Sequence, residues 1–249
     1  MIEAYGSGSS QAGELLLPDG AGGRNGFPVA VVVHGGFWRE RYGRDLMAPL
    51  CADLARRGWA AWNLEYRRLG DGPGGGGGWP ATGEDVLAGT AHLAQLDAPL
   101  DLGRVVAAGH SAGGQLAVWL AARASRVRVR VRAAVSLAGV TDLALAHELR
   151  LSDGVVEAFL GGRPEQVPER YADASPAALV PLGVPVLCVH GTADDAVPIA
   201  VSEAFAARAR AAGDDVDLRV LEGTGHLELI DPDDAAWSVA ADWLERWRT

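Results

Sequence analysis

The serine best placed to do chemistry is Ser111, in the segment Gly109-His110-Ser111-Ala112-Gly113, which fits the pattern G-x-S-x-G. The apolar run Arg104–Ala108 precedes it as a predicted strand, and the Ala- and Leu-rich stretch Gly113–Arg123 follows as a predicted helix. Glycines on both sides permit the sharp turn that exposes the serine Oγ, and the helix N-terminus points its partial positive charge at it. This context predicts a nucleophile. The alternative is a helix N-cap serine after a glycine turn.

A serine is a weak nucleophile unless a neighbouring base takes its proton. His226 is the candidate base, because it lies in a glycine-containing loop directly after the predicted strand Val216–Leu221. The alternative is an ordinary loop histidine. In hydrolases that carry the serine on such a strand-to-helix turn, the acid and then the histidine follow it along the chain.

The candidate acid follows the preceding predicted strand, Val184–Val189. Two aspartates are adjacent there, and successive side chains point in different directions, so only one is expected to reach the histidine. We predict Asp194, with Asp195 in solvent or capping a helix. A carboxylate at this place holds the imidazole tautomer and stabilises the imidazolium that forms.

An acyl-transfer site also needs hydrogen-bond donors for the oxyanion of its tetrahedral intermediate. The turn at the serine supplies the backbone N–H of Ala112. Further donors are expected in the segment 34–38, which follows the predicted strand Phe27–Val33, and we predict Gly36 and Phe37. The alternative for this segment is a simple turn at the end of a strand.

Three side chains are candidates for the substrate pocket. Trp38, beside Phe37, could line an acyl or leaving-group pocket. Trp79 could do the same, or could anchor a surface loop. His110, next to the nucleophile, either lines the pocket or packs beneath it.

The other histidines are expected to have structural roles. His34 and His190 precede glycines at strand ends and are expected to brace loops, and His92 and His147 are expected in solvent. Outside the segments named above, no group of His, Asp and Glu has the spacing of metal ligands, so no metal site is predicted. The predicted chemistry needs no cofactor.

Strands alternate with helices from Phe27 to the end of the chain, and the strands are continuous apolar runs, as in a parallel sheet covered on both faces. The predicted class is therefore α/β. The remaining predicted strands are Glu14–Pro18, Trp59–Tyr66 and Ala133–Leu137, and the remaining predicted helices are Asp45–Arg57, Thr82–Leu96, Ile199–Ala212 and Asp233–Arg248.

Four stretches are expected to be irregular. Residues 1–13 predict a loose arm, and residues 70–79, with seven glycines, predict a flexible surface loop without the Lys-Ser/Thr of a phosphate loop. Residues 126–132 alternate Arg and Val, which indicates a half-exposed run rather than a nucleic-acid patch. Residues 140–181 predict an excursion with short helices that could act as a lid.

The 249 residues, 49% of them hydrophobic, are enough for one sizeable core, so a single domain over residues 1–249 is predicted. The formal net charge of -10 disfavours nucleic acid and membrane surfaces as partners and leaves a small acyl substrate. All 22 residues counted as Lys+Arg are Arg, which excludes Schiff-base chemistry and a lysine-dependent phosphate loop.

The two cysteines, Cys51 and Cys188, fall in a helical pattern and an apolar strand, so buried free thiols are expected, as in a reducing compartment. The stretch Met1–Gln11 has neither a basic nor an apolar signal region, and no run approaches 18 apolar residues. These observations predict a cytoplasmic protein with no membrane span.

Over nearly its whole length the chain resembles the α/β-hydrolase superfamily, which implies the α/β-hydrolase fold. His34-Gly35-Gly36-Phe37-Trp38 resembles the HGG-type oxyanion segment of hormone-sensitive-lipase-like esterases and arylformamidases. Those esterases usually have a third glycine where this chain has Phe37, so the segment is more similar to the formamidase-like branch. His190-Gly191-x-x-Asp194-x-x-Val197-Pro198 is similar to the acid-bearing segment of the superfamily, which favours Asp194 over Asp195.

Together these features predict a carboxylesterase that cleaves small esters through an acyl-enzyme intermediate. An amidase of arylformamidase type uses the same machinery and stays open, as do a thioesterase and an acyltransferase. A peptidase is less expected, because no additional domain gates the site. A non-catalytic binding protein on this fold usually lacks one of the three residues, and all three are present here.

Overall fold

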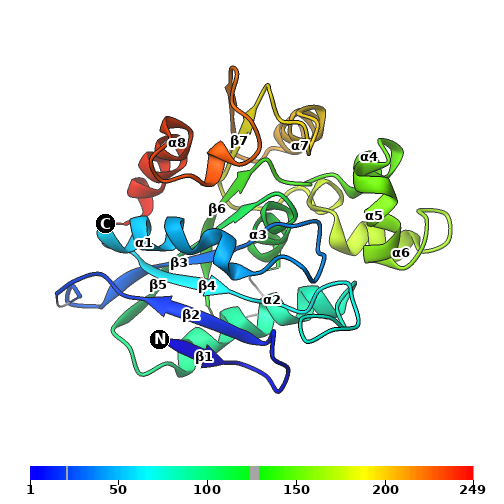
Figure 1. Ribbon diagram of the computed structural model, residues 1–249. Coiled ribbons are helices and arrows are strands. Elements are labelled where there is room, and N and C mark those ends of the chain that lie inside the picture. The colour runs from blue at the N-terminus through cyan, green and yellow to red at the C-terminus, as the bar shows by residue number, and fades with distance from the viewer. Residues whose placement is uncertain (21, 124–128, 249) are drawn as a thin grey trace.

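A mostly parallel eight-stranded sheet forms the centre of the molecule in the computed structural model, which describes residues 1–20, 22–123 and 129–248 (Figure 1). The strand order is β1-β2-β4-β3-β5-β6-β7-β8. β1 and β2 are antiparallel to their neighbours, and the other pairings are parallel. The strands are β1 Ile2–Ala4, β2 Ala12–Leu16, β3 Phe27–Val33, β4 Ala60–Leu64, β5 Leu100–His110, β6 Val131–Leu137, β7 Val186–Gly191 and β8 Val216–Leu221.

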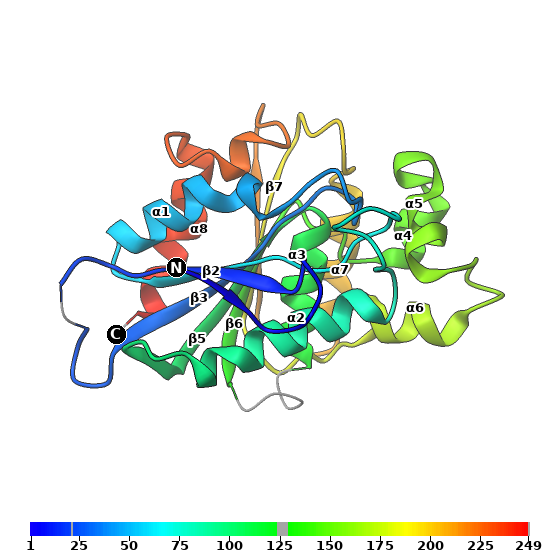
Figure 2. The same ribbon diagram turned by 60° about the horizontal axis from the view of Figure 1, so that its bottom comes forward.

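Helices cover both faces of this sheet, as Figure 2 shows for α1 and α8 on one side and α2 on the other. The helices are α1 Ala48–Arg56, α2 Ala81–His92, α3 Ala112–Ala122, α4 Leu143–Glu148, α5 Leu151–Leu160, α6 Pro168–Ala174, α7 Ala200–Ala211 and α8 Ala235–Leu244. Successive residues of β3 enter opposite cores: Val31 packs on the side of α2 and α3, and Val32 on the side of α1 and α8. A strand that is covered on both faces has an unbroken apolar sequence. The predicted α/β class is confirmed.

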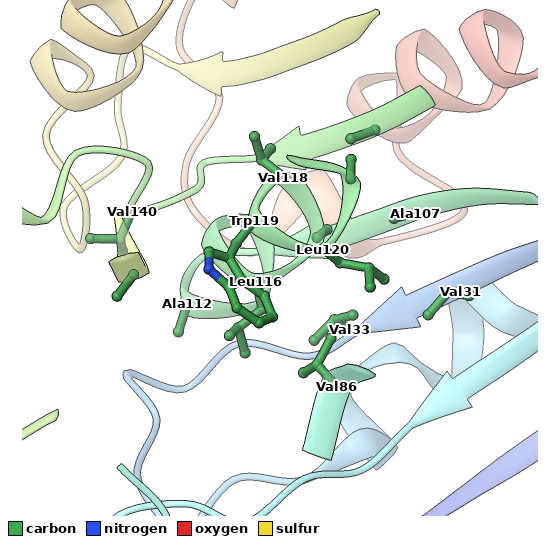
Figure 3. Packing of buried hydrophobic residues seen from close by; sticks show 14 of the residues in the cluster. Val31, Val33, Val86, Ala107, Ala112, Leu116, Val118, Trp119, Leu120 and Val140 are labelled. Carbon is green, nitrogen blue, oxygen red and sulfur yellow. The ribbon is translucent and has the colours of Figure 1, made fainter. Parts of the chain in front are cut away.

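Helix α3 lies against the middle of the sheet and is buried on all sides. Leu116, Trp119 and Leu120 pack against Val33 of β3 and Val86 of α2 (Figure 3). A helix enclosed all round needs small and apolar residues throughout, which accounts for its Ala- and Leu-rich sequence. The element that follows Ser111 is therefore rigidly held.

The prediction of a loose arm over residues 1–13 is wrong. Ile2 of β1 pairs with Glu14 of β2, and the Tyr5 hydroxyl donates a hydrogen bond to the Glu65 carbonyl at 2.7 Å. The strand β1 is only three residues long and ends in a Gly- and Ser-rich turn, so it carries almost no periodic signal of its own.

The glycine-rich loop of residues 70–79 is tied to the body of the protein by one carboxylate. Glu40 accepts hydrogen bonds from the backbone N–H groups of Gly72 (2.9 Å) and Gly74 (3.2 Å). The carbonyl of Gly74 in turn accepts a hydrogen bond from the Arg68 N–H at 2.9 Å. Its composition predicted a flexible loop, whereas its backbone has specific partners.

Residues 140–181 contain the expected short helices α4, α5 and α6, which lie together at one side of the molecule in both views (Figures 1 and 2). Of the run predicted over 126–132, residues 126–128 lie outside the described residues. In its remainder, Val129 and Val131 are buried while Arg130 and Arg132 are exposed, which confirms a half-exposed alternation there. The two cysteines are buried free thiols, as predicted, and burial raises the pKa of Cys188 to about 12.

Candidate active site

Ser111 occupies the sharp turn between β5, which ends at His110, and α3, which begins at Ala112. Its backbone angles, φ 56° and ψ −122°, are unusual for a residue with a side chain. The flanking glycines have no room for one: a Cβ on Gly109 would lie 2.1 Å from the Gly113 carbonyl oxygen, and one on Gly113 would lie 2.1 Å from that of Val33. The turn therefore needs both glycines, and they hold the serine in a strained conformation.

The Ser111 side chain is buried, and its Oγ has no hydrogen-bond partner among the described residues. A buried hydroxyl normally finds a partner, so one left free in a native fold calls for an explanation. Here the side chain faces a cavity of about 300 Å³ that is also lined by His226. The free Oγ and the imidazole thus line one cavity.

His226 and Asp194 form the closest contact of the site, with His226 Nδ1 2.6 Å from Asp194 Oδ2. Since a carboxylate accepts the hydrogen bond, Nδ1 carries the proton and Nε2 is left free to act as a base. The other carboxylate oxygen, Oδ1, accepts from the N–H groups of Ala196 (2.9 Å) and Val197 (2.8 Å). Asp195 is exposed instead, so the structure brings Asp194 and not its neighbour to the histidine.

The electrostatic setting keeps Asp194 ionised. Burial raises its pKa, but hydrogen bonds from His190, His226 and the Val197 N–H more than offset this and hold the pKa well below its usual range. An ionised, immobile carboxylate is what orients the imidazole and stabilises its protonated form.

The predicted oxyanion segment lies against the serine. Gly36, Phe37 and Trp38 have consecutive positive φ values of 104°, 51° and 54°, which turn the chain sharply after β3. A Cβ on Gly35 would lie 2.9 Å from the Ser111 Cβ, so the absence of a side chain there lets the segment approach the nucleophile. Gly36 and Phe37 line the same cavity as Ser111.

Ala112 is the first residue of α3, and the first N–H groups of a helix have no acceptor within it. Its N–H therefore stands free beside the nucleophile. The three predicted oxyanion donors, Gly36, Phe37 and Ala112, are thus all next to Ser111 in space.

His34 braces the oxyanion segment, as predicted for this residue. Its ring stacks on Tyr66 with a centroid separation of 4.3 Å, and its Nε2 lies 2.8 Å from Glu65 Oε1. The Tyr66 hydroxyl donates to the His34 carbonyl at 2.8 Å. The ring and the carbonyl are both fixed, so the turn that follows starts from a defined position.

His110 lies partly beneath the site and partly at its wall. Its Nε2 donates a hydrogen bond to the His226 carbonyl at 3.0 Å, and the two rings are 4.3 Å apart. Burial lowers the pKa of His110 to about 3, so the ring is neutral at pH 7. Both alternatives left open by the sequence describe this residue, because it also lines the cavity.

The structure does not bring Trp38 or Trp79 to this cavity, which corrects their assignment to a substrate pocket. Trp38 is fully buried, donates from Nε1 to Gln115 Oε1 at 3.1 Å and stacks on Phe159 at 4.2 Å. Trp79 packs edge-on against Trp119 at 4.9 Å. Their large apolar rings contribute more in the core than at a surface, and Trp38 ties the oxyanion segment to α3.

Five apolar wall residues were missed. Tyr42, Leu46, Ala196, Leu227 and Ile230 line the cavity together with Asp195 and the residues named above. Leu227 could have been suspected because it follows His226 directly. Tyr42 and Leu46 lie in a segment without any motif, so only the folded chain reveals them.

No group of three or more His, Cys, Asp or Glu side chains suited to a metal ion occurs among the described residues. In the same part of the chain, none of the helices combines the length and the apolar character needed to cross a membrane. No residue of the excursion 140–181 lines the cavity at Ser111, so its role as a lid stays a prediction.

The chain is similar to known proteins over most of its length. The BD-FAE family model matches residues 14–208. The esterase LipQ of Mycobacterium tuberculosis is 31% identical over 212 residues, which cover 79% of this chain and 48% of LipQ. The chain therefore spans about half the length of this curated relative.

Two solved structures share the fold at lower identity. A truncated carbohydrate esterase from gut microbiota superposes with a TM-score of 0.82 at 20% identity, covering 99% of this chain and 94% of that one. The esterase Est2 of Thermogutta terrifontis, solved with propionate bound, has a TM-score of 0.76 at 22% identity over 99% of this chain and 93% of its own. Both support the α/β-hydrolase fold predicted from the sequence.

Proposed function

Because the chain belongs to the BD-FAE family of α/β-hydrolase esterases, we propose that it is a serine carboxylesterase with Ser111, His226 and Asp194 as its catalytic triad. The observation that carries this proposal is that Ser111 Oγ, which bonds to none of the described residues, and His226 line one cavity, with His226 held by Asp194 at 2.6 Å. The matched LipQ is named an esterase, which supports the same activity.

The mechanism follows from the proton positions. His226 Nε2 takes the proton of Ser111 as Oγ attacks the ester carbonyl carbon, and the carbonyl oxygen becomes an oxyanion facing the N–H groups of Gly36, Phe37 and Ala112. The imidazolium, stabilised by Asp194, then gives its proton to the leaving alkoxide. The alcohol departs and an acyl-serine ester remains.

Water completes the cycle through the same groups. His226 takes a proton from water as its oxygen attacks the acyl carbon, and the second oxyanion occupies the same donors. Collapse of this intermediate breaks the bond to Ser111 Oγ, which recovers its proton from His226. The products are a carboxylic acid and the original serine.

The cavity favours a small acyl group. Its volume of about 300 Å³ is at the lower end of the range for ligand pockets, and its wall includes Phe37, Leu46 and Ile230. The neighbouring Est2 structure holds propionate, a three-carbon acid. We therefore propose short-chain esters as the substrate class.

The experiment compares hydrolysis of p-nitrophenyl acetate, butyrate and octanoate with hydrolysis of N-formylkynurenine, using Ser111→Ala as the control. The proposal expects turnover of the short esters that Ser111→Ala abolishes while the melting temperature stays unchanged. Faster turnover of the formamide would make the protein an amidase of the arylformamidase type. Transfer of the acyl group to an added alcohol or amine in preference to water would make it an acyltransferase.

The two buried free thiols, Cys51 and Cys188, fit a reducing compartment, and on that basis we propose that the protein acts in the cytoplasm. Fractionation of producing cells with a cytoplasmic and a secreted marker tests this. Recovery with the secreted marker would contradict it.

A further inference from the structure

His190 is the second histidine beside Asp194, and the proposed reaction does not use it. It lies in β7, four residues before the aspartate, and its ring is fully buried. Its Nε2 is 2.9 Å from the Val197 carbonyl oxygen and 3.3 Å from Asp194 Oδ2, the same oxygen that accepts from His226. The Asp194 carboxylate is therefore flanked by two imidazoles.

The contacts of the His190 ring fix where its proton sits. A carbonyl oxygen can only accept, so Nε2 must be the protonated nitrogen. The other nitrogen, Nδ1, lies 2.8 Å from the hydroxyl oxygen of Ser202, a buried residue of α7 that can donate to it. With Nδ1 occupied as an acceptor, the ring presents an N–H to both Val197 O and the carboxylate.

We propose that His190 acts on the reaction through Asp194, as a hydrogen-bond donor to the catalytic carboxylate, with Ser202 holding its ring in the tautomer that donates to Asp194; this inference rests on the proposed function. The donated hydrogen bond draws electron density from Oδ2, the oxygen that faces His226. Since Oδ1 is already held by two backbone N–H groups, the carboxylate keeps its place without His190. What His190 adds is control over how strongly Oδ2 attracts the proton of His226.

Removal of the His190 donor should shift the pH dependence of the reaction in one predictable direction. Without the N–H of His190, Oδ2 carries more charge and stabilises the His226 imidazolium more strongly. A larger fraction of His226 is then protonated at a given pH and cannot act as a base. The pH profile of kcat/KM falls on its acid side as the essential base of the free enzyme becomes protonated. This acid limb should therefore move to higher pH.

The test compares two substitutions of His190. His190→Met removes the donor, and we expect its acid limb to move up by about 0.5–1 pH unit, so that kcat/KM on that limb falls by up to about tenfold while the plateau at higher pH is kept. His190→Gln places an amide N–H close to the former Nε2, and we expect it to restore the acid limb toward that of the wild type. An NMR titration of the His226 ring should show the same order of midpoints and needs no turnover.

A second pair keeps the proposal testable if His190→Met does not fold. Ser202→Ala removes the hydroxyl that orients the ring and should move the acid limb in the same direction by less, whereas Ser202→Thr keeps the hydroxyl and should match the wild type. Thr90→Ala is the matched control, because it also removes a buried helix hydroxyl, bonded to Val86 O at 2.8 Å, far along the chain from the site. It should lower the melting temperature without moving the acid limb.

The inference is overturned if folded His190→Met keeps the wild-type limb, if Met and Gln move it equally, or if Ser202→Ala behaves as Ser202→Thr. Failure of the proposed function shows up elsewhere, as turnover that persists in Ser111→Ala. The His226 titration would still decide the role of His190 in that case.

Discussion

His226 Nδ1 lies 2.6 Å from Asp194 Oδ2, although 32 residues separate the two along the chain. The loop after β7 and the loop after β8 deliver them to the same edge of the sheet, because these neighbouring strands are parallel. A contact this short between a buried carboxylate and an imidazole fixes which nitrogen carries the proton.

Substitution of Asp194 and of Asp195 should have different effects on kcat. Asp194→Asn keeps the shape but turns an acceptor into a group that can favour the wrong imidazole tautomer, and we expect kcat to fall about 10⁴-fold. Asp195→Asn changes a side chain that the structure leaves exposed, and should keep kcat within about tenfold. Equal losses in the two variants, measured on p-nitrophenyl acetate, would reject Asp194 as the acid.

The glycine at position 36 should be essential for the oxyanion site. Its φ is +104°, and a Cβ there would lie 2.4 Å from the Tyr42 side chain, so Gly36→Ala must displace the segment that carries the donors. We expect kcat to fall by about 10²–10³-fold, the usual effect of losing one oxyanion donor. Gly223→Ala is the matched control, since its φ is +72° but nothing lies within 4 Å of the added Cβ. It carries similar backbone strain and should lose stability without this loss of kcat.

The apolar wall should set acyl length. Ile230→Ala removes three side-chain carbons from the cavity wall and so enlarges the cavity. We expect the ratio of kcat/KM for octanoate over acetate esters to rise at least about tenfold. The adjacent Leu229→Ala removes a fully buried side chain that packs in the core between the sheet and α1 and α8. It should cost stability and leave the ratio unchanged. A similar ratio in both variants would place the acyl group elsewhere.

Burial of neutral His110 should make folding sensitive to acid. Its pKa of about 3 in the folded protein lies below the ordinary value of about 6.5, so the unfolded chain binds a proton that the folded one does not as the pH falls through that interval. The free energy of unfolding should fall by up to about 1.4 kcal/mol per pH unit between pH 6.5 and 3 on account of this residue. His110→Gln keeps an N–H for the His226 carbonyl and does not titrate.

Urea unfolding at pH 7, 6, 5 and 4 measures this. The wild type should lose more stability than His110→Gln at each step down. Parallel curves for the two proteins would show that His110 takes up its proton over the same pH range in the folded and the unfolded state, and would contradict the lowered pKa.

Much of the fold could be predicted because its central strands are buried on both faces. The bounds of β3 and β8 are those predicted: β3 is a compact apolar run, and β8 alternates Val and Leu with Asp217 and Arg219. β1 could not be predicted, because three residues hold too little pattern and its pairing with β2 is a tertiary effect.

Some residues of the candidate site could likewise be predicted from the sequence, and others could not. Ser111, Asp194 and His226 lie in short segments whose glycines and spacing follow from the chemistry, so the sequence indicates them. Trp38 was misassigned because a large ring beside an oxyanion turn can face either the pocket or the core, and only the packing against Phe159 decides. Ile230 carries no local signal, and its place at the cavity comes from the fold alone.

The most direct test of the central claim is labelling with a fluorophosphonate probe, followed by peptide mass spectrometry. Ser111 is proposed as the nucleophile, so the wild-type protein should take up one probe on the peptide that contains Ser111 and lose ester hydrolysis as it does so. Ser111→Ala should neither be labelled nor turn over, at an unchanged melting temperature. Labelling of a different residue, or wild-type turnover by Ser111→Ala, would contradict the account.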